Sequence, residues 1–215
     1  PACLGDWRNV VCFVGDDEDG NTHLNQSDQL ATLIDTAYGM YNIDKIYFDA
    51  YPQESTPVGQ RYPGVKEAIN KRVERGALLI NYTGHGGEAG WAHESVLGVS
   101  DVNSWKNYDN MPVFMTATCE FSRFDDPGRT SAGELVLLNP NGGGIALFTT
   151  VRLVFSNSNF EINKSLYANV FKPVNGVKPS MGEIFRKTKA ANATSSNTRN
   201  FTLLGDPALK LAYPA

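Results

Sequence analysis

The sequence has no hydrophobic run that approaches the roughly 18 residues of a membrane-spanning helix, so we expect no transmembrane segment. It has no cluster of basic residues, and a formal net charge of −4 gives no reason to expect nucleic acid as a partner. A signal peptide is also absent, and the chain begins at Pro1 rather than Met. We therefore expect one domain over residues 1–215, excised from a longer precursor.

Cysteine is scarce, with only Cys3, Cys12 and Cys119 in the chain. An odd number at these spacings does not indicate a disulfide framework. Cys12 lies inside an apolar run and is expected to pack as a small hydrophobic residue. Cys119 follows an apolar run, where a side chain can emerge from the core, so it is the candidate for chemistry.

Short β-rich runs alternate with segments of helical periodicity, which predicts right-handed crossovers and a mostly parallel sheet covered by helices on both faces. The fold class is therefore an α/β three-layer sandwich. A mobile loop is expected over residues 190–200 and a short last strand over 208–212. The other expected strands are 9–14, 45–48, 77–82, 113–118 and 144–149, and the expected helices are 27–41, 64–75, 131–138, 157–171 and 180–193.

Reactive residues follow three of these strands. The first ends in an acidic run that contains Asp17, the third in Thr83-Gly-His-Gly-Gly and the fourth in Thr118-Cys-Glu. In open α/β sheets, ligands bind beyond the carboxyl ends of the strands. Asp17, His85 and Cys119 are therefore expected to meet at one rim of the sheet.

His85 and Cys119 each have an ordinary structural explanation, as a histidine in a turn and as a buried thiol. Together at one sheet edge they favour a nucleophile and its base, because a neighbouring imidazole favours the thiolate. Asp17 would orient the imidazole. The backbone N–H groups of Gly86 and Cys119 are the expected oxyanion donors.

The acidic cluster at residues 16–19 admits three interpretations: a solvated turn, an orienting carboxylate for His85, or a calcium site. The mechanism requires no cofactor. Calcium has weak support, because Gly20 stands at the fourth position of the pattern rather than the sixth. The ligands of that pattern would be Asp17, Asp19, Asn21 and Asp28.

Three rival functions are less well supported. A phosphate-accepting receiver domain needs an Asp after the third strand, where this chain has His85. A zinc site built from His85, His93 and Cys119 lacks any short ligand spacing. A non-catalytic scaffold or binding domain would have no need to keep both His85 and Cys119.

The chain resembles the catalytic domain of the gingipain family of cysteine peptidases, whose fold is similar to that of the caspases. The resemblance covers residues 9 to 211 and implies that Cys119 is the nucleophile and His85 the catalytic histidine. It places the third, acidic residue at Asp17, with Asp16 as the near alternative. It is carried by Asn81-Tyr-Thr-Gly-His-Gly-Gly-Glu-Ala-Gly-Trp, Met111-Pro-Val-Phe-Met-Thr-Ala-Thr-Cys, Gly144-Ile-Ala-Leu-Phe-Thr-Thr and Leu204-Gly-Asp-Pro-Ala-Leu.

The resemblance also implies which residues line the substrate site. The acid that reads a basic substrate side chain in arginine-specific members has no clear match here, and His23 lies nearest to its position. Arg152 would repel such a side chain, so trypsin-like specificity is not expected. The expected oxyanion and substrate-binding residues are Gly86, Glu88, Trp91, Arg152 and Phe155.

Within the family, the acidic run and the Gly86-Gly87 pair are most similar to the cell-surface sortases of the type IX secretion system. That likeness implies a protein or peptide substrate, namely the C-terminal secretion signal of secreted cargo, cleaved by hydrolysis or transpeptidation. It also implies outer-membrane secretion components as partners and a location at the surface of a Gram-negative bacterium.

Overall fold

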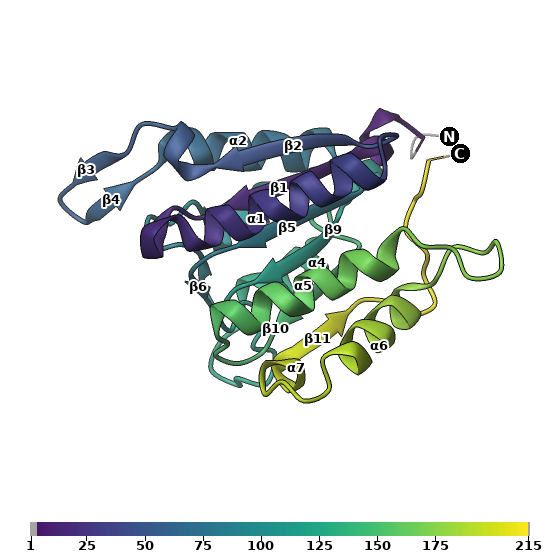
Figure 1. Ribbon diagram of the computed structural model, residues 1–215. Helices are drawn as coiled ribbons and strands as arrows, with labels where there is room; N and C mark the ends of the chain where they lie inside the picture. The colour runs from purple at the N-terminus through teal and green to yellow at the C-terminus, as the bar shows by residue number, and fades with distance from the viewer. Residues whose placement is uncertain (1–3, 215) are drawn as a thin grey trace.

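A six-stranded sheet forms the centre of the computed structural model, which describes residues 4–214 (Figure 1). Neighbouring strands are parallel except β10 and β11, which are antiparallel. The sheet is therefore mostly parallel, as the alternation of strands and helices predicts. In spatial order the strands are β11 (Phe201–Leu204), β10 (Ala146–Thr150), β9 (Val113–Ala117), β5 (Leu79–Thr83), β1 (Val10–Gly15) and β2 (Asn42–Tyr47).

Helices cover both faces of the sheet (Figure 1). Successive side chains of a strand point to opposite faces, so Val11 and Phe13 join one core while Cys12 and Val14 join the other. No helix within residues 4–214 is both long enough and apolar enough to cross a bilayer. The first core packs against α1 (Glu18–Ala37), α5 (Ser156–Val170) and α6 (Met181–Ala191), and the second against α2 (Pro63–Arg75), α3 (Val99–Ser104) and α4 (Ala132–Leu138).

Shorter elements complete the fold. A three-stranded sheet of β6 (Gly86–Gly87), β7 (Gly90–Trp91) and β8 (Leu97–Gly98) follows β5 directly. The first strand of this small sheet therefore begins directly after His85. The remaining elements are the hairpin β3 (Glu54–Thr56) and β4 (Gly59–Arg61), helix α7 (Asn197–Asn200), and three 3₁₀ turns at Asp6–Asn9, Phe48–Ala50 and Tyr108–Asn110.

A buried amide pair fixes the end of β5. Asn81 donates to Asn163 Oδ1 of α5 at 2.7 Å, and Asn163 donates back to Asn81 Oδ1 at 3.1 Å. Both side chains are buried, so losing one partner would leave a polar group without hydrogen bonds in the core. The pair links β5, the strand before His85, to helix α5, which packs on one face of the sheet.

The segment 190–200 was expected to be a mobile loop, and this expectation is wrong. It contains the end of α6 and the short helix α7. The Asn197 side chain, buried in α7, donates to Phe155 O at 2.8 Å and to Asn159 Oδ1 at 3.0 Å. These bonds attach α7 to the start of α5. The Ser, Thr and Asn content of the segment thus supplies capping and anchoring groups rather than flexibility.

The last strand also lies earlier than expected, at Phe201–Leu204 instead of residues 208–212. Gly205, with a φ of 125°, turns the chain out of the sheet after this strand. Pro207 follows, and it has no N–H to donate to a ladder. Beyond it, Lys210 forms only an isolated bridge with Ser180.

Candidate active site

Two adjacent parallel strands bring His85 and Cys119 to the same edge of the sheet. Thr83 of β5 is in register with Ala117 of β9, and each strand ends there. His85 and Cys119 each follow two residues later. A Cβ on Gly86 would lie 2.6 Å from Thr118 Oγ1, so the two loops are in direct contact.

The backbone of His85 is held by Asp16, which is fully buried after β1. One carboxylate oxygen of Asp16 accepts the His85 N–H at 2.8 Å, and the other accepts the Glu18 N–H at 3.1 Å. On the other side of the turn, the Tyr82 hydroxyl donates to His85 O at 2.5 Å. Asp16 therefore connects the loop after β1 to the loop after β5 and fixes the position of the histidine.

Asp19, not Asp17, lies against the imidazole of His85. Asp19 Oδ2 is 3.0 Å from His85 Nε2, and this hydrogen bond is the main reason that the pKa of the Asp19 carboxyl is lowered. Asp17, which we expected behind the ring, instead accepts the Tyr62 hydroxyl at 2.6 Å. The cause is a left-handed turn at the start of α1, where Asp19, Gly20 and Asn21 have φ values of 55°, 63° and 63°.

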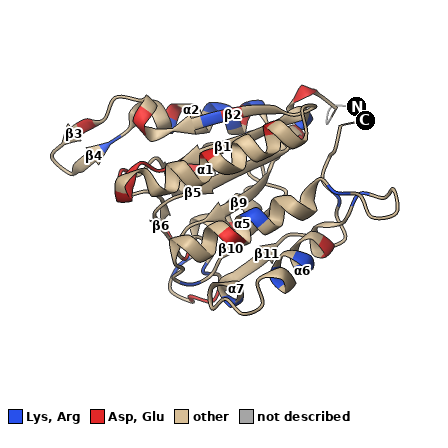
Figure 2. Cartoon of the chain, viewed as in Figure 1, with Lys and Arg blue, Asp and Glu red and all other residues tan. Residues whose placement is uncertain are grey.

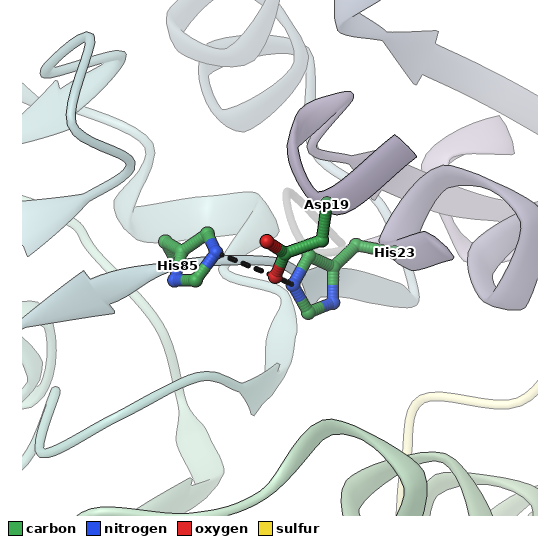
Figure 3. Close-up of side chains that lie close together, drawn as sticks. All are labelled: Asp19, His23 and His85. Carbon is green, nitrogen blue, oxygen red and sulfur yellow. Dashed lines mark hydrogen bonds and ion pairs between the residues drawn. The ribbon is translucent and has the colours of Figure 1, made fainter. Parts of the chain in front are cut away.

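All three histidines of the chain lie together beside this turn, and Figure 3 shows two of them, His23 and His85, with Asp19. The rings of His23 and His85 meet edge to face at 5.0 Å, and His93 stacks on His85 at 5.1 Å. Burial, followed by the charge of His85, lowers the pKa of His23. Acidic residues lie at the same end of α1 (Figure 2), and one of them, Glu18, has a carboxylate oxygen 3.5 Å from His93 Nδ1.

The Cys119 loop is held by the loop that follows β10. Cys119 is partly buried, and its sulfur lies 3.6 Å from Val154 O. The Glu120 N–H donates to Arg152 O at 3.3 Å, and the Thr150 hydroxyl donates to Thr118 O. Glu120 has a φ of 51°, a left-handed conformation that turns the chain sharply after the cysteine.

Two backbone N–H groups are free at this edge. Ala92 donates to His85 O at 2.8 Å, which makes Gly86–Trp91 the pair of the small sheet that exchanges no hydrogen bonds. The Gly86 N–H consequently points away from β7. Within residues 4–214, neither it nor the Cys119 N–H donates to a protein acceptor outside the regular ladders. Both were expected as oxyanion donors, and both are available.

Two of the residues expected to bind substrate have other contacts. Trp91 is fully buried and stacks on Tyr82 at 4.3 Å, so its ring supports the His85 loop from inside the core. Glu88 pairs with Arg123 at 2.9 Å and lies 3.6 Å from Arg129. Because Glu88 already has two cationic partners, it braces the neighbouring loops instead of offering a free charge.

The remaining two lie after β10, next to Val154. Phe155 is 75% exposed, so its ring is available as an apolar wall. Arg152 forms an ion pair with Asp125, with a second contact of 2.9 Å between Nη1 and Oδ1. This pairing reduces the repulsion that Arg152 would exert on a basic substrate group.

The carboxylates of the calcium pattern do not converge in this structure. Asp17 accepts from Tyr62, Asp19 contacts the imidazoles, and Asp28 accepts from Lys45 at 2.7 Å. Calcium therefore stays a prediction without support from this geometry. Sequence reasoning named Asp19 within the acidic cluster and His23 near the position of the specificity acid, but it did not place the two side chains together beside His85. Their i, i+4 spacing is the signal that could have done so.

Fold and site together define the class of this protein: a caspase-like α/β sandwich with a cysteine and a histidine on adjacent strand ends. Residues 1–212 match the model of peptidase family C25, and the chain belongs to this family. A comparison with curated protein sequences finds no match.

Several solved structures share the fold. The Arg-specific cysteine proteinase gingipain R matches with a TM-score of 0.73 and 20% identity over 96% of this chain and 48% of that chain. The complex of Porphyromonas gingivalis RgpB pro- and mature domains gives 0.76 and 20%, over 96% and 49%. The Saccharomyces cerevisiae separase–securin complex gives 0.58 and 12%, over 94% and 12%. This chain thus spans about half the length of the gingipain chains, and the similarity establishes the fold.

Proposed function

We propose that the protein is a cysteine peptidase in which Cys119 attacks a peptide carbonyl and His85 carries the proton. The observation that supports this most strongly is the contact between the loops that carry the two residues, in a chain of family C25. A nucleophile and a base on neighbouring strand ends are the minimum that acyl transfer needs.

In this proposal, the two ring nitrogens of His85 have separate roles. Asp19 occupies Nε2 and fixes the orientation of the ring, which leaves Nδ1 to exchange a proton with the thiol. The thiolate of Cys119 adds to the carbonyl carbon, the C–N bond breaks, and the proton held by His85 passes to the departing amine. The products are a thioester that joins the N-terminal part of the substrate to Cys119 and a released C-terminal fragment with a new free amino group.

The carbonyl oxygen becomes negatively charged during this addition. The N–H groups of Gly86 and Cys119 are in place to bind it, because neither is used by the protein outside the ladders within the described residues. One such donor contributes roughly 3 kcal/mol to lowering the barrier. Gly86 also has no side chain, so the substrate backbone can approach the loop closely.

The resemblance to PorU, the sortase of the type IX secretion system, suggests the substrate class: the C-terminal secretion signal of cargo proteins at the surface of a Gram-negative cell. One feature favours this over an arginine-specific protease. Exposed Phe155, in the loop beside the cysteine, offers an apolar surface rather than a carboxylate. Outer-membrane secretion components are the partners that this proposal implies.

The replacement Cys119→Ala tests the peptidase. We expect it to abolish cleavage and labelling by a thiol-reactive peptidyl probe, with the melting temperature unchanged. Cys12 serves as an internal control, because it is fully buried and burial raises the pKa of its thiol, so the probe should not label it. Cleavage that persists in Cys119→Ala would exclude the mechanism.

The fate of the thioester distinguishes hydrolysis from sortase activity. With a cargo C-terminal peptide as substrate, added amine should appear in the product as a new amide if the protein is a transpeptidase. Mass spectrometry of the product measures this directly. If the amine is never incorporated and only the acid forms, the protein is a hydrolase and the sortase assignment fails.

A further inference from the structure

A cluster of three side chains beside His85 has the composition of a metal site. Asp19, His23 and His85 each offer one ligand atom, and these atoms lie within 4.8 Å of one another (Figure 3). Asp19 Oδ2 is 3.0 Å from His85 Nε2 and 3.3 Å from His23 Nε2. We propose that these residues bind a divalent transition metal, with Zn²⁺ as the best fit, and that its binding switches off the peptidase.

The first argument is the unpartnered nitrogen of His23. His23 is only 6% exposed, and its Nε2 has no hydrogen-bond partner among the described residues although it faces Asp19. Ser156 donates its hydroxyl to Gln26 Oε1 at 3.3 Å and lies 3.4 Å from His23 Nδ1. The serine oxygen is therefore free to accept an Nδ1 proton, and in that tautomer Nε2 carries a lone pair.

That tautomer places two acceptors opposite each other. In the tautomer with the proton on Nδ1, the Nε2 lone pair of His23 and the carboxylate oxygen of Asp19 lie 3.3 Å apart. A buried acceptor without a partner is unfavourable, and a cation between the two atoms would satisfy both. Ser156 on the far nitrogen matches the usual arrangement of a metal-bound imidazole, whose second nitrogen is hydrogen-bonded to the protein.

Two of the three distances between ligand atoms fit a small tetrahedral ion. Zn²⁺ binds imidazole nitrogen and carboxylate oxygen at about 2.0–2.1 Å, so two ligands of a tetrahedron lie about 3.3 Å apart. The Asp19 contacts of 3.0 and 3.3 Å are close to this value. Two imidazoles with one carboxylate favour zinc over the oxygen-binding ions calcium and magnesium.

The site suits an ion that exchanges with solvent rather than one that is bound permanently. Three protein ligands leave a fourth position for water, and Asp19 is 60% exposed, so an ion can enter from solvent. The left-handed turn at Asp19, Gly20 and Asn21 is part of the protein's own fold, and it positions the Asp19 carboxylate. Occupancy should therefore follow the concentration of free metal.

The effect on catalysis rests on the proposed function. In that mechanism, His85 keeps one proton on Nε2 and cycles a second proton through Nδ1. A metal ion bound to the Nε2 lone pair leaves the one proton of the neutral ring on Nδ1. Nδ1 then has no lone pair to accept the proton of Cys119. The ion would also fix the ring to Asp19 and His23, away from the thiol.

Zinc titration of metal-free protein, followed by calorimetry, tests the site without any reference to activity. We expect one ion per chain, and a loss of at least tenfold in affinity for Asp19→Asn and for His23→Gln. Asp19 is exposed, so its variant remains informative if His23→Gln fails to fold. The matched controls His93→Gln and Cys119→Ala should bind zinc as the unchanged protein does.

The controls also decide against the proposal if it is incorrect. Zinc binding that survives Asp19→Asn and disappears in Cys119→Ala would place the ion on the thiol and overturn the site. In an activity assay, zinc should inhibit cleavage and a chelator should restore it. Full cleavage by zinc-loaded protein would overturn the switch, whereas metal-free protein that cleaves nothing would overturn the proposed peptidase and leave the calorimetric result standing.

Discussion

At the scale of single residues, Asp17 and Asp19 form a natural comparison. They carry the same side chain two positions apart, yet Asp17 accepts from Tyr62 while Asp19 contacts His85 Nε2. We expect Asp19→Asn to lower kcat by about 10²-fold, because an imidazole in the wrong orientation or tautomer is not placed for proton transfer. Asp17→Asn should stay within about twofold, since an amide oxygen can still accept from Tyr62.

Steady-state kinetics on a peptide substrate measure both variants, with equal melting temperatures as the control for folding. The opposite order, with Asp17→Asn inactive and Asp19→Asn active, would restore the residue that the family resemblance indicated. His85 and Cys119 could be predicted from sequence because each follows an apolar run whose end marks the end of a strand. The identity of the third residue could not, because it depends on the left-handed turn at Asp19 and on packing between loops.

At the scale of elements, the connection from β5 to β6 depends on close contact with the loop after β1. A Cβ on Gly84 would lie 2.6 Å from the Tyr82 hydroxyl and inside the space of Asp16. We expect Gly84→Ala to destabilise the fold by about 1–3 kcal/mol through this overpacking. It should also reduce cleavage, because Asp16 and Tyr82 hold the backbone of His85.

Gly87→Ala is the matched control, since it lies on the same loop with nothing within 4 Å of its Cβ position. Thermal unfolding should show a melting temperature several degrees lower for Gly84→Ala and an unchanged one for Gly87→Ala. Equal melting temperatures would mean that the loop relaxes around the new methyl group, and that close packing does not explain why the position holds glycine.

The predicted strands are accurate where the local sequence determines them, and inaccurate where pairing with a distant strand does. The strands at residues 77–82 and 113–118 were predicted to within two residues, because continuous apolar runs suit strands buried on both faces. The last strand was misplaced from 201–204 to 208–212. Local pattern favoured either segment, and the choice depended on which one could pair with β10 after helix α6.

At the scale of the whole molecule, two hydrophobic cores lie on opposite faces of one sheet. Each strand contributes to both, as the alternation of Val11 and Phe13 with Cys12 and Val14 shows. A sheet shared in this way cannot lose one layer and keep the other face ordered, because the same backbone hydrogen bonds support both. The helices of the two layers should therefore unfold together.

Tryptophan fluorescence can test this coupling, because Trp91 and Trp105 both belong to the second core. Phe148 belongs to the first core and is buried, so Phe148→Ala should cost about 3–5 kcal/mol. If the sheet couples the faces, this change will shift the fluorescence transition and the circular dichroism transition by the same amount. The exposed control Val58→Ser should shift neither. A fluorescence transition that stays in place while the circular dichroism splits into two steps would show that the layers unfold separately, and that the sheet is not the common support that its topology indicates.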